Sequence, residues 1–413
     1  MSLGITCRDM DVDPIEFYLA EGGLLSKRMP DFEFRPQQLD MARAVARSLN
    51  EARHLIVEAG TGTGKSLAYL IPAILWAVAN NKKVVISTYT KTLQEQILKH
   101  DIPLISEKLD LSFRYSLCMG HENYLSLRRL KRASQSEMFA RPQENRQLQS
   151  IFDWAGQTQT GLKTDLPFEP LPTVWEDVGR QKDLCLGKNC ETYEACFYFK
   201  ERRKWFGAHL LIVNHHLFFA NVGAGGGVLP RFDAVVFDEA QNIEEAATSF
   251  LGLEISNTGM FYFLDRLYHP KTKRGTLARL EAAFAYTPQV IKLAGQARRA
   301  VDKFFEQALE TYGRKERVLR FHKPPDLENH LFEPLEELQE ALKTLEASLE
   351  SEEDRLDVAA ASNRCFEYRN SLAAFLHQHL EGYVYWLEVT ERKRFPRVVL
   401  RGVPINLAPV LKE

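Results

Sequence analysis

The sequence predicts an α/β fold in which a parallel sheet is interrupted by two long insertions. Three observations predict it. Short apolar runs rich in Val and Ile recur without polar alternation, which is typical of strands buried on both faces of a parallel sheet. The first run ends at a glycine-rich turn that opens a helical stretch. From about residue 257 to 380 the chain is instead rich in Leu, Ala, Glu, Lys and Arg at helical spacing, which predicts a mainly helical insertion.

Five apolar runs are expected to be strands of this sheet. Four of them start at His54, Lys83, Leu210 and Ala234. The fifth covers residues 397–403, and we expect it to return the chain to the same sheet. Between the second and third strands, residues 109–207 form a segment too long for a loop in a compact domain, so we expect a subdomain there.

Composition excludes several classes of protein. The 413 residues are 45% hydrophobic and 26% charged, which excludes wholesale disorder and favours two or three domains. With 53 Lys and Arg against 55 Asp and Glu, any nucleic-acid surface has to be a local patch. No run approaches the roughly 18 apolar residues of a membrane span, and the N-terminus carries no targeting pattern. We therefore expect a cytoplasmic monomer without membrane contact.

A phosphate-binding loop joins the first expected strand to its helix. Glycines allow backbone N–H groups to converge on phosphate oxygens, Lys65 can reach the β and γ phosphates of a nucleotide, and Ser66 can bind Mg²⁺. The loop departs from the strict pattern at its first glycine, which is Ala59 here. The nucleotide-binding residues predicted in this loop are Gly60, Thr61, Gly62, Thr63, Gly64, Lys65 and Ser66.

An acidic pair follows the strand expected at Ala234. Asp238 is predicted to hold Mg²⁺ through water, and Glu239 to orient and deprotonate the attacking water. An acidic pair after a strand is common by itself. Together with the phosphate loop, and with Lys65 as the third catalytic residue, it predicts a nucleoside triphosphatase that uses ATP and Mg²⁺.

Three cysteines fall within twelve residues, at positions 185, 190 and 196. Six cysteines in the whole chain are too few for a disulfide scaffold, so the group formed by Cys185, Cys190 and Cys196 suggests metal ligation or redox chemistry. The segment that follows, residues 197–206, mixes aromatic and basic side chains. It can stack bases of a single strand, or it can be an amphipathic helix whose aromatic residues are buried, and the sequence leaves both interpretations open.

The order of these motifs resembles the iron-sulfur group of superfamily 2 helicases, to which DinG, YoaA and XPD belong. Residues 34–41, Phe-Arg-Pro-Gln-Gln-Leu-Asp-Met, are similar to the adenine-reading segment of that group, which points to Gln38 and to Arg35. Residues 87–96 are similar to its first DNA-contacting motif, and residues 214–217, Asn-His-His-Leu, also match. We interpret the two histidines there as a packing or coupling element. The acidic pair opens a four-residue acidic box, residues 238–241, Asp-Glu-Ala-Gln, whose last residue is Gln241 where the group usually has His.

The resemblance is most specific in the cysteine segment, whose Cys-x4-Cys-x5-Cys spacing matches the cluster ligands of the group. It implies a 4Fe-4S cluster held by Cys185, Cys190 and Cys196. The fourth ligand of the group is a cysteine after Asn-Tyr-Leu, and Ser126 stands at that position here. Cys118 is an alternative fourth ligand. A three-iron cluster, zinc and no metal all remain open.

The resemblance also implies a division of the chain and a function. It implies a RecA-like motor lobe built from residues 1–108, 208–256 and 385–413, an iron-sulfur insertion at 109–207 and a helical arch at 257–384, without the second motor lobe. The implied function is an ATP-dependent DNA helicase of 5′ to 3′ polarity, acting on single-stranded DNA and duplex junctions in repair or replication. We expect this chain to bind ATP and DNA but to hydrolyse ATP poorly. A DNA-binding regulator without motor activity and an RNA helicase-type triphosphatase are the alternatives.

Overall fold

The structure is a computed structural model that describes residues 13–29, 32–60, 62–135, 142–281, 284–313, 317–391 and 395–406. The chain divides into two compact units. The first comprises residues 1–119 and 200–247, and the second comprises 120–199 and 248–413. Each unit has a hydrophobic core of its own, so each is described by itself.

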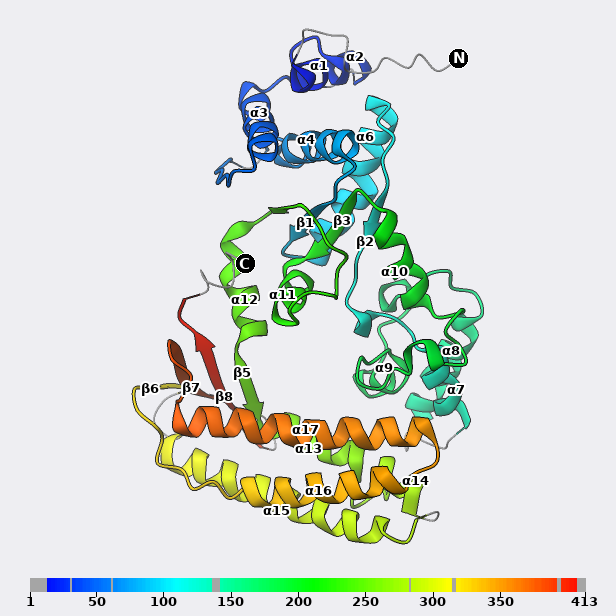
Figure 1. Ribbon diagram of the computed structural model, residues 1–413, viewed down its shortest axis with the longest axis vertical. Helices are drawn as coiled ribbons and strands as arrows, with labels where there is room; N and C mark the ends of the chain where they lie inside the picture. The colour runs from blue at the N-terminus through cyan, green and yellow to red at the C-terminus, as the bar shows by residue number, and fades with distance from the viewer. Residues whose placement is uncertain are drawn as a thin grey trace. The chain divides into compact units, whose positions relative to one another are not determined.

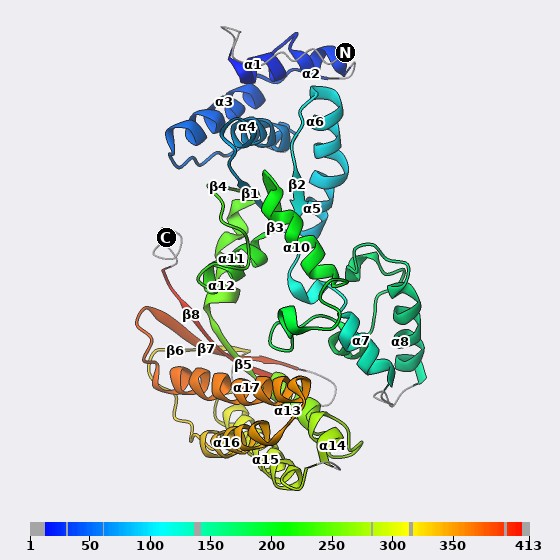
Figure 2. The ribbon, with the colours of Figure 1, turned by 45° about the vertical axis from the view of Figure 1, so that its right-hand side comes forward.

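The first unit is built on a four-stranded parallel sheet (Figures 1 and 2). Its strands are β1 (Val84–Thr88), β2 (Tyr115–Leu117), β3 (Leu210–Asn214) and β4 (Ala234–Phe237), in the order β2-β3-β1-β4. Every residue of β1 is buried, because helices cover this central strand on both faces. Three of the five predicted strands are therefore confirmed as β1, β3 and β4.

Helices of various lengths connect and cover these strands. They are α1 (Pro14–Leu19), α2 (Leu24–Arg28), α3 (Pro36–Glu51), α4 (Lys65–Asn80), α5 (Lys91–Gln96), the π-helix η1 (Ile97–Asp101), α6 (Ile102–Leu109), α11 (His215–Gly223) and the 3-10 turn η5 (Ala240–Asn242). The core packs α3, α4 and α6 against β1 and β3. Two helices cross the unit boundary, α10 (Phe197–Gly207) and α12 (Ile243–Leu251).

The strand expected at His54 is absent from the described sheet, and that prediction is wrong. Residues 54–59 form neither strand nor helix, and Ile56 in the middle of the run is 99% exposed. The prediction used only apolar and β-branched content. A strand also needs a hydrogen-bonded neighbour, which the composition of one segment cannot supply.

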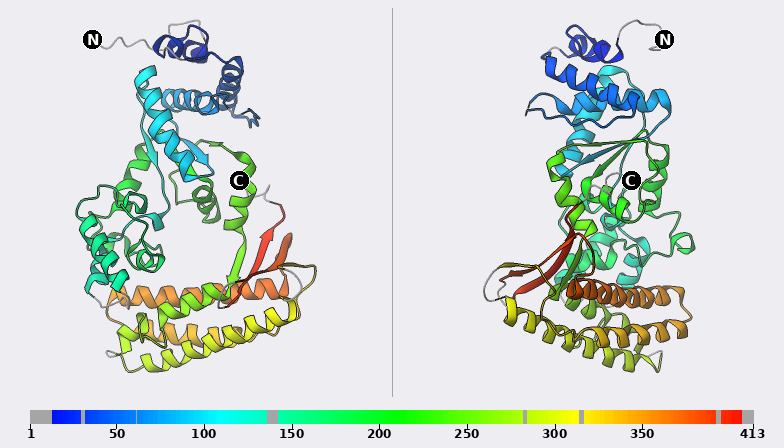
Figure 3. Two further views of the ribbon diagram at one scale, coloured as in Figure 1. Left: turned by 180° about the vertical axis from the view of Figure 1, so that it is seen from behind. Right: turned by 60° about the vertical axis from the view of Figure 1, so that its left-hand side comes forward.

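The second unit contains a group of long helices and an antiparallel sheet. Its helices are α7 (Leu127–Gln135), α8 (Pro142–Ala155), α9 (Pro172–Val178), α13 (Asn257–Leu267), α14 (Thr276–Glu281), α15 (Thr287–Tyr312), α16 (Phe332–Ser348) and α17 (Glu352–His377), with 3-10 turns η2 (His121–Asn123), η3 (Lys163–Asp165) and η4 (Gly187–Asn189). Helices α15, α16 and α17 lie side by side (Figures 1 and 3). Their apolar faces form most of the core, so the mainly helical insertion is confirmed.

The sheet of the second unit has the order β5-β8-β7-β6 and is antiparallel throughout. Its strands are β5 (Leu253–Ser256), β6 (Val318–Phe321), β7 (Tyr383–Thr390) and β8 (Arg397–Pro404). The strand predicted at 397–403 exists as β8, but it pairs with β5 and β7 and does not join the parallel sheet. The assignment of this strand to the parallel sheet is therefore wrong. An apolar strand does not by itself specify which strand it pairs with or in which direction. Among the described residues, no helix is long and apolar enough to cross a bilayer.

Candidate nucleotide site and cysteine pocket

The phosphate loop lies at the N-terminus of α4 in the first unit. Gly62 and Gly64 have positive φ angles of 79° and 77°, a region that favours glycine. Gly64 is the N-cap of α4, and a Cβ atom there would come within 2.0 Å of the Gln38 side-chain amide. The loop therefore requires glycine at this position for two independent reasons. The start of α4 favours an anion at this loop.

Two residues of the segment before the loop hold it in place. The Gln38 amide, only 5% exposed, donates a hydrogen bond to the Gly64 carbonyl at 3.0 Å. The Arg35 guanidinium donates to the Gly62 carbonyl. Within the loop, the Thr63 hydroxyl donates to the Gly60 carbonyl at 2.9 Å. The structure thus brings these predicted residues together around one loop, whereas Thr61 lies outside the described residues.

The acidic pair follows β4 and faces the same helix. The Asp238 N–H donates to the Ser87 carbonyl at 2.8 Å, and the Tyr69 hydroxyl of α4 donates to Asp238 Oδ2 at 3.2 Å. Glu239 has a left-handed backbone with φ 58°, and its N–H donates to Asp238 Oδ1 at 3.1 Å. Such a conformation in a residue with a side chain costs about 1–2 kcal/mol and concentrates at functional sites.

The side chains of the loop and of the acidic pair converge. Lys65 Nζ lies 3.9 Å from Glu239 Oε1. The Gln241 amide donates to the other oxygen of that carboxylate, Oε2, at 2.5 Å. The ammonium and carboxylate are each about one-third exposed, so both remain open to a ligand. A lysine, two carboxylates and a loop of N–H groups in one place suit a Mg²⁺-bound triphosphate.

Sequence reasoning missed two polar residues at this site. Asp101, in the π-helix η1, is half-buried, and burial raises its pKa while a hydrogen bond from the Ser66 hydroxyl lowers it. Burial beside Asp238 raises the pKa of Tyr69 well above its usual value. Neither residue belongs to a short motif. The signal that finds Asp101 is the π-helix, which is frequent at functional sites but is not visible in the sequence.

The segment with similarity to a DNA-contacting motif is only partly accessible. Ser87 and Thr88 are fully buried in β1, and Gln94 is 2% exposed. The Thr90 hydroxyl caps α5 by accepting from the Leu93 N–H at 3.2 Å. Contact with phosphate from this segment is thus restricted to its exposed residues, which include Thr90, Thr92 and Gln96.

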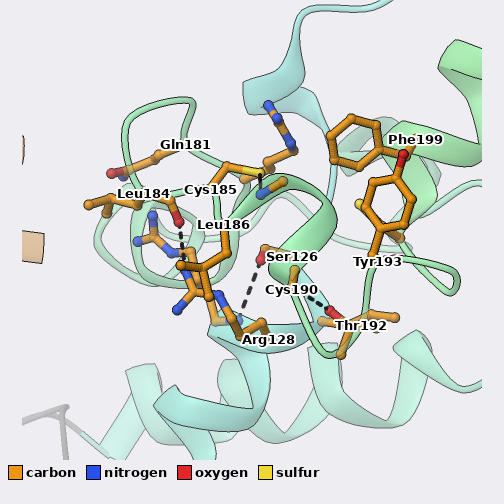
Figure 4. Close-up of a pocket in the computed structure, with 15 residues that line it drawn as sticks. Ser126, Arg128, Gln181, Leu184, Cys185, Leu186, Cys190, Thr192, Tyr193 and Phe199 are labelled. Atoms are coloured by element: carbon orange, nitrogen blue, oxygen red, sulfur yellow. Dashed lines mark hydrogen bonds between the residues drawn. The ribbon is translucent and has the colours of Figure 1, made fainter. Parts of the chain in front are cut away.

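In the second unit, the three cysteines line one pocket (Figure 4). Cys185 Sγ accepts from the Gly187 N–H at 3.4 Å, and Cys190 Sγ lies 3.3 Å from the Thr192 hydroxyl. Ser126 lines the same pocket from the segment before α7. Cys118 lies in the first unit directly after β2, where burial raises the pKa of its thiol well above the usual value.

Arginines surround the cysteine pocket. Arg128, Arg129 and Arg180 all line it, and Arg128 donates to the Leu184 carbonyl at 2.6 Å in the cysteine loop. Three thiols, a hydroxyl and nearby cations suit an anionic iron-sulfur cluster in chemistry. In the described part of the chain, however, no three His, Cys, Asp or Glu side chains are gathered closely enough to hold a metal ion.

The aromatic and basic segment after the cysteines is mostly packed. Phe197 and Tyr198 are each 7% exposed, and the Arg180 guanidinium lies over the Tyr198 ring at 4.1 Å. Trp205 is fully buried in the first unit, whereas Phe206 is 60% exposed. The helix α10 thus supports the packing interpretation for most of the aromatic residues and leaves Phe206 accessible.

Two family models and several curated proteins match the sequence of this chain. Residues 36–150 match the DEAD/DEAH box helicase family, and residues 178–260 match the family described as DEAD_2. The chain is 30% identical over 410 residues to the ATP-dependent DNA helicase YoaA of Escherichia coli, covering 95% of this chain and 59% of that protein. It is 32% identical over 272 residues to the ATP-dependent helicase DinG of Mycobacterium tuberculosis, covering 61% of this chain and 40% of that one.

A solved XPD helicase is similar over 89% of this chain and 54% of its own, with 14% identity and a TM-score of 0.46. The chain spans about three-fifths of the E. coli relative, 59% of its length.

Proposed function

Because this chain is a homologue of the YoaA and DinG helicases, we propose that it is the ATP- and DNA-binding part of an ATP-dependent DNA helicase. The substrates we propose are single-stranded DNA and duplex junctions, with 5′ to 3′ polarity, in repair or replication. The division into a motor lobe, an iron-sulfur insertion and a helical arch is part of the same proposal, with β8 assigned to the second unit and not to the motor lobe.

One observation carries the proposal. Lys65 Nζ lies 3.9 Å from the Glu239 carboxylate, while Asp238 is held beside α4 by Tyr69. A bound triphosphate would take the Lys65 ammonium as its counter-ion, Ser66 and Asp238 would hold Mg²⁺, and Glu239 would then be free to orient water. Gln38 and Arg35 are proposed to bind the adenine base. Each side chain would then give up its present hydrogen bond to a loop carbonyl and form one with the base.

Nucleotide binding followed by hydrolysis tests the proposal. We expect Mg²⁺-dependent binding of ATP that Lys65→Ala abolishes. Glu239→Gln is expected to bind ATP normally, because the amide keeps the size of the side chain, and to lower any DNA-stimulated hydrolysis at least 100-fold, as expected for loss of a general base. ATP binding that is unaffected by Lys65→Ala would refute the site. Nucleotide and DNA binding without hydrolysis in a longer chain would favour the regulatory alternative.

For the second unit we propose a 4Fe-4S cluster held by Cys185, Cys190 and Cys196, with Ser126 as the fourth donor. The supporting observation is that all four line one pocket together with three arginines. A cluster bound there would tie the cysteine loop to the start of α7 and thereby stabilise the unit. Cys118 remains the alternative fourth ligand.

Anaerobic purification with iron and acid-labile sulfide quantified tests the cluster. We expect about four of each per chain. Ser126→Ala should lower the iron content, whereas Cys118→Ser should leave it unchanged. The reverse pattern would make Cys118 the ligand, and bound zinc or no metal would refute the cluster.

A further inference from the structure

Ser87 lies in the central strand β1, between the ends of the neighbouring strands β3 and β4. In the parallel sheet its Cα is opposite Val213 in β3 and Phe237 in β4. His215 begins α11 two residues after Val213, and Asp238 directly follows Phe237. The register of the sheet therefore places one of these residues on either side of Ser87.

Ser87 makes a polar contact in both directions. Its carbonyl accepts the Asp238 N–H at 2.8 Å, and its hydroxyl lies 2.7 Å from His215 Nδ1. Asn214 fixes the start of α11 because its side chain accepts the Leu217 N–H at 2.8 Å. The position of the His215 ring is thus set by a capped helix and by the central strand.

The His215 ring also lies next to the acidic box, because it interacts with the backbone of Asp238 and Glu239. His215 is 0% exposed, and among the described residues no hydrogen bond of full geometry reaches its Nε2. Burial lowers the pKa of His215, and hydrogen bonding with the backbone of Glu239 and Asp238 opposes that lowering, so these polar groups lie next to the ring. The imidazole therefore has polar neighbours on two sides, the Ser87 hydroxyl and the backbone of the acidic box, and its polar atoms need them because the ring is buried.

The acidic box next to the His215 ring has a strained backbone. Glu239 is in the left-handed region at φ 58°, and its carboxylate is the proposed general base. A small change in this peptide would redirect the carboxylate, and a hydrogen bond to its backbone would fix it. On its other side, His215 contacts Ser87 at the beginning of the segment with similarity to a DNA-contacting motif.

We propose that His215 is a positioning residue that couples the DNA-contacting segment to the acidic box. With its proton on Nε2, the imidazole accepts a hydrogen bond from the Ser87 hydroxyl and donates one to the box backbone when DNA and nucleotide are both bound. DNA contact would thereby bring the Glu239 carboxylate into position for hydrolysis. This inference rests on the proposed function and deepens it.

The affinity for a non-hydrolysable ATP analogue, measured with and without oligo(dT), tests the inference. The ratio of the two affinities is the coupling factor, which is typically about 5–150 for coupled sites. We expect His215→Ala to lower this ratio to below about 2. His215→Asn and His215→Gln keep an amide near only one of the two ring nitrogens, so both should also lose coupling. His216→Ala, one residue further along, is the matched control and should retain it.

His215→Phe separates coupling from packing. The ring lies among aromatic neighbours, with Phe237 at 5.8 Å and Tyr89 at 6.2 Å between centroids, so Phe is expected to fold. A Phe variant with a full coupling factor would overturn the inference, as would a wild-type chain that binds the analogue without any coupling. In the ¹⁵N spectrum of the wild-type protein, we expect His215 to be neutral with its proton on Nε2, and a proton on Nδ1 would contradict the proposal.

Failure of the proposed function gives a different result. In that case, the wild-type chain and Lys65→Ala would bind the analogue equally weakly. If instead Lys65→Ala abolishes binding and His215→Ala keeps the wild-type coupling factor, the function stands and only the role of His215 is refuted.

Discussion

At the nucleotide site, backbone geometry restricts which amino acid can occupy a position as much as the chemistry of phosphate binding does. Gly64 combines a positive φ with close approach of the Gln38 side chain. A motif search finds this glycine, but the reason it is needed is a contact 26 residues away in sequence. Gln38 and Gly64 therefore constrain each other.

Gly64→Ala is expected to weaken ATP binding at least tenfold and to lower the free energy of unfolding by about 1–3 kcal/mol, because the new Cβ meets both the left-handed backbone and the Gln38 amide. Isothermal titration and urea denaturation measure the two effects. Gly60→Ala is the control for stability: nothing lies within 4 Å of a Cβ there, and its φ is not positive. Equal destabilisation by the two variants would contradict the contact with Gln38.

Thiol reactivity is the second prediction at this scale. Cys365 is fully buried in the helical core, and burial raises its pKa to about 12, so at pH 8 only about one thiol in ten thousand is ionised. Iodoacetamide at pH 8 is therefore expected to label the half-buried Cys185 and Cys190 of the metal-free protein well before Cys365 and Cys118. Peptide mass spectrometry gives the order, and early labelling of Cys365 would contradict its burial.

At the scale of elements, charged side chains join three helices of the second unit. Asp357 of α17 accepts from Arg132 of α7 at 2.6 Å and from Arg279 of α14 at 3.2 Å. Glu353, one turn earlier, accepts from Arg132 at 2.8 Å. The cluster joins α7, which begins directly after Ser126 of the cysteine pocket, to the long helix α17.

Asp357→Asn is expected to lower the free energy of unfolding of the second unit by about 1–3 kcal/mol, because its carboxylate is only 12% exposed and serves two guanidinium groups. Glu367→Gln is the matched control, since its pair with Arg364 is more than half exposed on both sides, and the expected change is below about 0.5 kcal/mol. Urea denaturation followed by circular dichroism compares them, and equal losses would refute the cluster's importance.

Elements were predictable where the signal was local. Mainly apolar runs predicted β1, β3 and β4, and helical spacing predicted α15, α16 and α17. The failures involve partners distant in sequence. The run at His54 has strand composition but no ladder, and β8 was assigned to the wrong sheet because its partners β5 and β7 could not be read from its own residues. The sheet register that places His215 beside Ser87 also depends on residues distant in sequence, whereas the Asn214 cap is local.

At the scale of the whole molecule, two separate cores imply two partly independent stabilities. The nucleotide site lies in the first unit, so ligand binding should stabilise that unit first. At an ATP-analogue concentration 100 times the Kd, we expect the free energy of unfolding of the first unit to increase by about 2.7 kcal/mol. Hydrogen exchange with mass spectrometry should show slower exchange in α4 and β4 and little change in α15. Equal slowing in both units would contradict this independence.

The interleaved order of the two units has a consequence for synthesis on the ribosome. The central strand β1 ends at Thr88, but its neighbours β3 and β4 begin only at Leu210 and Ala234, after an entire stretch of the other unit. At about 5–20 residues per second, translation of the intervening segment of about 120 residues takes roughly 6–25 s. During that time β1, whose five residues are all buried in the folded protein, is outside the exit tunnel without the neighbouring strands of its sheet. We therefore expect the nascent chain to be a client for chaperones that hold apolar segments, and slowing translation after β1 should increase its aggregation.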